Sequence, residues 1–106
     1  MKPGRSYRED LIEDLKDRRE AAAYLNAALE EGDKDVFLLA LRDVLDAQGG
    51  MTKIAQYAKM NRVSLYKMLS KKGNPEFESI LSLLNALRIK FQVVSERESR
   101  THKRAA

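Results

Sequence analysis

Apolar residues recur at helical spacing through the first part of the chain, and polar capping residues separate the segments. Ser6 with Glu9 three residues later is a capping-box pattern, and leucines and an isoleucine follow on one face of a short helix. Asp17 with Glu20 repeats the pattern before an alanine- and leucine-rich segment that Gly32 ends. The sequence therefore predicts two amphipathic helices in the first third of the chain.

A third helix is predicted over residues 34–47, with Asp33 as its cap and Gly49-Gly50 beyond its end. Its apolar residues occur nearly all the way around, and such a helix belongs in the centre of a bundle. The leucines of the chain and Phe77 are expected in the core.

Three shorter elements follow the glycine pair. Two periodic segments, about 51–58 and 62–70, are separated by a three-residue turn, and Gly73 is expected to end the second. Asn74 and Pro75 are typical of the N-cap and first turn of another helix.

After this helix the apolar period changes to two. Ile89, Phe91 and Val93 alternate with polar residues, which predicts a short strand over 89–94. A lone strand in a helical domain needs a partner, and the sequence leaves open whether that partner is a second copy or another protein.

The composition fits one small globular domain and argues against catalysis. The chain has 106 residues, of which 43% are apolar and 34% are charged. It contains no cysteine, and its only histidine is His102 near the end, so we expect no catalytic, metal or cofactor site. No apolar run approaches the ~20 residues of a membrane span, and no apolar signal region follows the N-terminus. We expect a cytoplasmic protein that is neither an enzyme nor membrane-bound.

The net charge of +4 conceals an asymmetry between the halves. Residues 1–50 carry 8 lysines and arginines against 12 aspartates and glutamates, a balance of −4, whereas residues 51–106 carry 12 against 4, a balance of +8. The window 51–75 holds six basic residues and no acidic one. This pattern favours a polyanion partner on the basic side. The acidic half, in turn, suggests attraction of a basic protein.

The stretch 52–70 has the pattern of two short helices joined by a tight turn, the geometry that lets a second helix enter the major groove of DNA. Positions where the two helices cross must be small or apolar, and Ile54, Ala55, Ala58, Met60, Leu65 and Leu69 meet this requirement. A solvated basic hairpin is the plainer interpretation of the same residues.

If the leucines of the second helix point inward, its opposite face would read base edges. This face holds Arg62, Val63, Tyr66 and Lys67. Arg62 is the strongest candidate, because a guanidinium can bond both acceptors of a guanine edge. Contacts to phosphates, which position a protein without reading sequence, are predicted for Thr52, Lys53, Asn61, Ser64, Lys71, Lys72 and Asn74.

These residues carry a resemblance to a known family. The pattern Ile54-Ala55, Lys59-Met60-Asn61, Leu65 and Ser70, closed by Gly73-Asn74-Pro75, is similar to the Cro/repressor-type helix-turn-helix. Within that group the chain resembles the addiction-module antidote (antitoxin) proteins, on residues 21–33, 41–44, 49–52 and 65–70. The resemblance runs from about residue 17 to residue 94 and departs at Lys59, where the turn usually has glycine. Either the turn differs, or Lys59 adopts a left-handed conformation.

The resemblance implies an all-α bundle of five to six helices, of the lambda-repressor-like DNA-binding type, with the short C-terminal strand. It also implies a homodimer that binds its own operator, which is double-stranded DNA, and neutralises a toxin of the RelE/ParE type. We expect a helical extension over 1–33, a DNA-binding domain over 34–94 that forms one compact unit with it, and a polar flexible tail over 95–106.

Two other functions stay open at the level of the sequence. The first is a stand-alone or phage-type repressor, which binds operator DNA without a toxin partner. The second is a helical adaptor that does not bind operator DNA and uses its basic face for protein or RNA. Ile89, Phe91 and Val93 are candidates for a strand that contacts either the second copy or the toxin.

Overall fold

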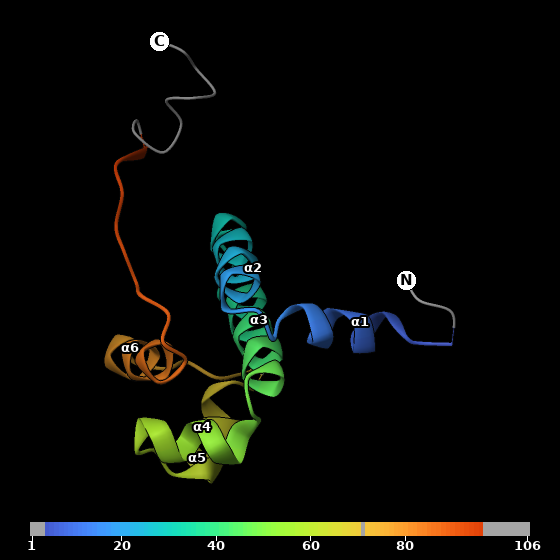
Figure 1. Cartoon of the computed structure of the whole chain (residues 1–106). Coiled ribbons are helices and arrows are strands. Elements are labelled where there is room, and N and C mark those ends of the chain that lie inside the picture. Colours follow the sequence, from blue (N-terminus) through green and yellow to red (C-terminus); the bar gives the residue numbers. More distant parts are fainter. Residues whose placement is uncertain (1–3, 71, 97–106) are drawn as a thin grey trace.

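The computed structural model describes residues 4–70 and 72–96, which contain six α-helices and no strand (Figure 1). The helices are α1 (Tyr7–Asp14), α2 (Arg18–Glu30), α3 (Lys34–Ala47), α4 (Met51–Ala58), α5 (Arg62–Met68) and α6 (Phe77–Ala86). The predicted all-α class is confirmed. None of the helices in these segments is both long enough and apolar enough to cross a bilayer.

The first three helices begin where their capping residues predict. The Ser6 hydroxyl accepts a hydrogen bond from the Glu9 backbone N–H at 3.0 Å, and the Glu9 carboxylate accepts one from the Ser6 N–H at 2.8 Å. These bonds to Ser6 hold the pKa of Glu9 below its usual value. Asp17 and Asp33 cap α2 and α3 through their side chains.

Helix α3 occupies the predicted central position. It packs against α1, α2 and α4, and α4 in turn packs against α5 and α6. Figure 1 shows α4 and α5 together at the lower end of the molecule and α1 extending to one side. The two N-terminal helices therefore reach the basic C-terminal unit through α3.

The core is built from the inward faces of these helices. Its members with no exposed surface are Ala21, Leu41, Val44, Leu45, Leu65 and Leu83. The expectation that every leucine is buried is wrong, because Leu29, Leu39 and Leu81 lie at the surface. Phe77 is also not a core residue: 58% of it is exposed, and its ring packs edge-on against Phe91 with centroids 5.4 Å apart.

A polar cluster lies inside the N-terminal half. Asp43 is only 5% exposed, on the buried face of α3. Its two carboxylate oxygens accept hydrogen bonds from Arg8 Nη1 of α1 at 2.7 Å and from the Tyr24 hydroxyl of α2 at 2.8 Å. Arg8 also bonds Asp46 at 2.7 Å. One carboxylate thus joins three helices.

The cluster shifts the titration of its members. The pKa of Tyr24 is raised to about 12, mainly because the side chain is partly buried and to a smaller extent because its hydroxyl donates a hydrogen bond to Asp43. The hydrogen bond to Asp43 raises the pKa of Arg8. Both shifts keep the partners of Asp43 protonated, which suits a buried carboxylate that needs donors.

The connection from α5 to α6 differs from the prediction. Helix α5 ends at Met68, so Gly73 does not terminate it, and α6 begins at Phe77 with Glu76 as its N-cap, after Asn74 and Pro75. Gly73 has a different role. A Cβ there would lie 2.1 Å from the Met68 carbonyl oxygen, so only glycine lets the chain pass this closely. The Gly73 carbonyl accepts a hydrogen bond from Lys34.

The predicted strand over 89–94 is wrong for the isolated chain. Residues 89–95 contain no strand, and Figure 1 shows this segment as a long run leading away from α6. The physical reason is that no other part of the described chain offers an edge with which it could form a ladder. Most of the predicted tail 95–106, including His102, lies outside the described residues.

Replacing Asp43 by alanine tests the polar cluster. The change leaves the partly buried Tyr24 hydroxyl and one arm of Arg8 without their acceptor, and we expect the free energy of unfolding to fall by about 2 kcal/mol. Asp46→Ala is the matched control, because it removes only the more exposed partner of Arg8 and should cost less than about 1 kcal/mol. Urea unfolding of both variants measures the difference. Equal losses would mean that Asp43 has no special role.

Candidate nucleic-acid interface

The turn between α4 and α5 is fixed by backbone hydrogen bonds. Lys59 lies in the left-handed region with φ 56° and ψ 44°. Its N–H donates to the Gln56 carbonyl at 3.2 Å, and the Met60 N–H donates to the Ala55 carbonyl at 2.8 Å. This is a Schellman motif, so the turn is the ordinary one and the lysine adopts the conformation that glycine usually supplies.

Asn61 is the N-cap of α5, which begins at Arg62, where the second periodic segment is predicted to begin. Its Oδ1 accepts hydrogen bonds from the backbone N–H groups of Val63 at 2.8 Å and Ser64 at 3.1 Å. The cap uses the side-chain oxygen as an acceptor and leaves the Asn61 amide nitrogen, which is the donor a phosphate oxygen requires, free of this contact.

The two faces of α5 separate as the sequence predicts. Leu65 and Leu69 are buried, whereas Arg62, Val63, Tyr66 and Lys67 are exposed. The Arg62 guanidinium lies over the Tyr66 ring, 5.5 Å from its centroid. Such a cation–π contact favours one arrangement of the Arg62 side chain over the others.

The residues predicted for phosphate contacts all have exposed side chains where the structure describes them. These are Thr52, Lys53, Asn61, Ser64, Lys72 and Asn74, and Lys71 lies outside the described residues. The Lys53 ammonium lies 5.8 Å from the centroid of the Tyr57 ring on its own helix, α4.

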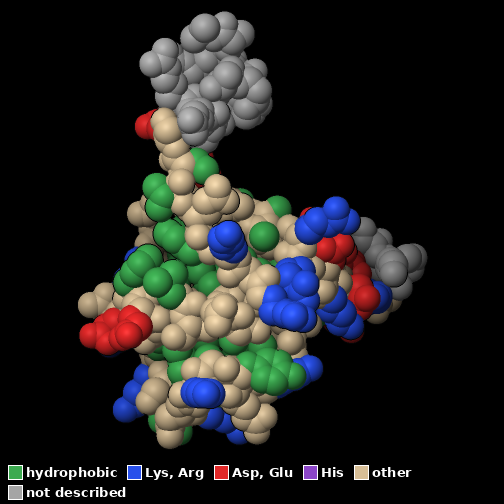
Figure 2. Space-filling view, turned by 60° about the vertical axis from the view of Figure 1, so that its left-hand side comes forward, with side chains coloured by type: hydrophobic (Ala, Val, Ile, Leu, Met, Phe, Trp, Pro, Cys, Tyr) green, Lys and Arg blue, Asp and Glu red, His purple; other side chains and the backbone are tan. Residues whose placement is uncertain are grey.

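The basic charge of this unit is not neutralised. In the part of the chain that the structure describes, no ion pair engages Lys53, Arg62, Lys67 or Lys72. Figure 2 shows lysine and arginine side chains at the lower end of the molecule, where α4 and α5 lie, with no acidic side chain among them on this face. An unpaired basic surface without carboxylates is suited to a polyanion.

Two features of the unit were not predicted from the sequence. The stacks of Arg62 on Tyr66 and of Lys53 on Tyr57 both join a cation to an aromatic ring four residues later. That spacing is visible in the sequence and places the two side chains on one helix face. No pattern in the sequence indicates the hydrogen bond from Lys34 to the Gly73 carbonyl, because the two residues lie far apart in the chain.

The left-handed conformation of Lys59 can be tested with two substitutions. Lys59→Gly removes the Cβ and Lys59→Ala keeps it, while both remove the charge, so their difference isolates the backbone strain. We expect the glycine variant to be more stable than the alanine variant by about 1 kcal/mol, as measured by thermal or urea unfolding. An alanine variant as stable as the glycine variant would contradict this account of the turn.

Comparison with known proteins identifies the family of this chain. The family model described as "Probable addiction module antidote protein" matches residues 6–95. An uncharacterized protein of Haemophilus influenzae (strain Rd) is 39% identical over 88 residues, which cover 83% of this chain and 90% of that protein. No solved structure gives a significant match. Since the family model spans most of the chain, the protein belongs to the family of probable addiction module antidote proteins.

Proposed function

We propose that this protein is the antitoxin of a toxin–antitoxin module, and that it represses its own operator as a dimer and neutralises a RelE/ParE-type toxin by direct binding. The observation that carries the DNA-binding part is the exposed outer face of α5, where Arg62 and Lys67 have no acidic partner in the described residues. The family match supports an antidote over a stand-alone repressor.

Base recognition in this proposal centres on Arg62. It lies in the first turn of α5, and the stack on Tyr66 orients its guanidinium before DNA arrives. A guanidinium held in this way can bond both acceptors of a guanine edge with less loss of side-chain entropy. Val63, which is 62% exposed beside it, suits a thymine methyl group.

Phosphate contacts come from the ends of the unit. Lys72 follows α5 and Lys53 lies in the first turn of α4, so the two ammonium groups flank the helix that would enter the groove. Such contacts fix orientation and make binding sensitive to salt without distinguishing sequences.

Dimerisation in this proposal uses the segment 89–94. Ile89 packs on the core and Phe91 on Phe77, but Val93 is 83% exposed, and the backbone of the segment has no ladder partner in the described chain. The same segment of a second copy would supply the missing ladder and cover Val93. Two α5 helices would then be available for two half-sites.

The roles of Arg62 and Lys72 can be separated by their dependence on sequence and salt. Arg62→Ala should weaken binding to the DNA upstream of this gene by about 1–3 kcal/mol and relax preference at one base pair. Lys72→Ala should weaken all duplexes alike and reduce the salt dependence by about one phosphate. Filter-binding titrations against upstream and scrambled DNA measure both effects. A loss from Arg62→Ala that is equal on every duplex would assign Arg62 to a phosphate, and an absence of duplex binding by the unaltered chain would refute the repressor function.

The dimer can be tested by a charge placed on the C-terminal segment. Val93→Asp should convert the dimer to a monomer in light scattering, because pairing would place two carboxylates in an apolar contact. Gln92→Asp is the matched control, since it adds the same charge on the opposite side of the alternating pattern and should leave the dimer intact. A dimer that survives Val93→Asp would exclude this segment from the dimer contact.

A further inference from the structure

An exposed leucine on α3 separates two hollows in the surface. Leu39 is 60% exposed, although it belongs to the most buried helix of the fold. A hollow of about 220 Å³ lies on its α2 side, between α2 and α3, and another of about 340 Å³ lies between α3 and the end of α5, where Leu69 and Ser70 line it. Leu39 lines both hollows. A partner could therefore place apolar groups on both sides of this one side chain.

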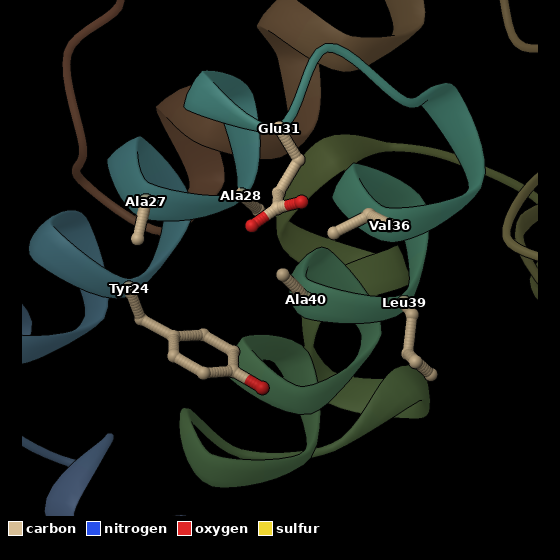
Figure 3. Close-up of a pocket in the computed structure, with 7 residues that line it drawn as sticks. All are labelled: Tyr24, Ala27, Ala28, Glu31, Val36, Leu39 and Ala40. Carbon is tan, nitrogen blue, oxygen red and sulfur yellow. The ribbon is translucent and has the colours of Figure 1, made fainter.

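Figure 3 shows how the first hollow is built. Val36 and Ala40 line it from α3, and Ala27 and Ala28 line it from α2. The Tyr24 ring closes one end, and its hydroxyl is held by Asp43, so this wall is fixed by the polar cluster. The Glu31 carboxylate extends over the space between the helices (Figure 3).

The rim of this surface is mainly acidic. Glu31 lines the first hollow and Asp35 lines the second, and both residues are exposed. Of the two basic residues nearby, Lys34 bonds Gly73 and lies 3.8 Å from Asp35, and Arg42 lines the second hollow. Glu31 forms no ion pair with any described residue. The carboxylate beside the first hollow is thus available to a positive charge from outside.

An apolar centre with a charged rim is the usual anatomy of a protein-binding surface. Leu39 and Val36 are exposed apolar side chains, and a partner that covers them removes their apolar surface from water, which favours binding. DNA is an unsuitable occupant, because its phosphates would face Glu31 and Asp35. The chemistry fits a protein segment that presents apolar side chains flanked by lysine or arginine.

We infer that the α2–α3 surface around Leu39, rimmed by Glu31 and Asp35, docks the cognate toxin through an apolar, basic segment of that toxin. This inference rests on the proposed antitoxin function, which supplies a protein partner. It assigns the toxin to a different surface from the outer face of α5 and from the segment 89–94. The two hollows would take apolar side chains of the toxin on either side of Leu39, and the acidic rim would speed and orient its approach.

The test compares three single substitutions to lysine. Leu39→Lys replaces the central apolar contact, and Glu31→Lys reverses a rim charge at the end of α2, where a cation suits the helix terminus. Asp14→Lys is the matched control, because it makes the same charge reversal on exposed α1, outside the surface. The probe is the purified protein encoded by the reading frame beside this gene, titrated calorimetrically into each variant.

We expect Leu39→Lys to weaken toxin binding at least about tenfold and Glu31→Lys to weaken it about threefold to tenfold. Asp14→Lys should change it less than about twofold. All three variants should keep the melting temperature and the upstream-DNA affinity of the unaltered chain.

Other outcomes would overturn the inference in distinguishable ways. Equal toxin binding by all four proteins would exclude this surface and leave the antitoxin function standing. Equal weakening by Glu31→Lys and Asp14→Lys would mean that general attraction to the acidic half, without a defined dock, accounts for binding. Conversion of the dimer to a monomer by Leu39→Lys would assign the surface to a second copy. No binding by the unaltered chain would refute the antitoxin function itself.

Discussion

The packing of α3 against the helices on either side of it is the contact on which the rest of the structure depends. Leu41, Val44 and Leu45 on this helix are fully buried, and α3 is the element through which α1 and α2 reach the basic unit. Asp43, on the same buried side, adds direction to this apolar contact, because a carboxylate must meet its donors in a defined geometry. Hydrophobic burial provides most of the free energy of the assembly, whereas the hydrogen bonds of Asp43 select one arrangement of α1 and α2.

Two basic residues in the left-handed conformation set the direction of the chain at the C-terminal side of the core. Lys59 ends α4, and Arg88 does the same after α6, where the Ile89 N–H donates to the Leu84 carbonyl at 2.9 Å. Each motif turns the chain sharply and brings the next apolar residue, Met60 or Ile89, back onto the core. A long basic side chain at these positions is strained relative to glycine, but it remains in solvent and adds positive charge beside the helix ends.

The parts of the fold that the sequence predicts well are those fixed by local chemistry. Asp33 with the apolar run behind it gives the limits of α3, and Asn61 gives the start of α5, because a cap and its helix lie within a few residues.

The predictions failed where the structure depends on contacts between residues far apart in the sequence. Phe77 is apolar and helical, yet its exposure depends on where α6 meets α4. Asn74 and Pro75 suit a helix start, but the close passage of Gly73 beside Met68 delays the helix to Phe77. Asp43 is one carboxylate among many until the fold places Arg8 and Tyr24 around it.

The charge asymmetry of the sequence corresponds to two separate surfaces of the fold, a basic one on α5 and an acidic one at the end of α2. The basic residues of α5 are exposed and unpaired in the described chain. They would attract any surface that is rich in carboxylates, including α1 and α2 of a second copy, in competition with the proposed DNA. Part of the acidic charge is removed from this competition internally, since Asp43 and Asp46 are paired with Arg8 and Asp17 and Asp33 cap helices. What stays available at the end of α2 is Glu31, which lines the same hollow as the exposed apolar side chain of Leu39. A carboxylate next to apolar surface attracts a cationic protein and repels a nucleic acid, so the separation of charge suits two different proposed partners: DNA for the basic face of α5 and a protein for this acidic surface.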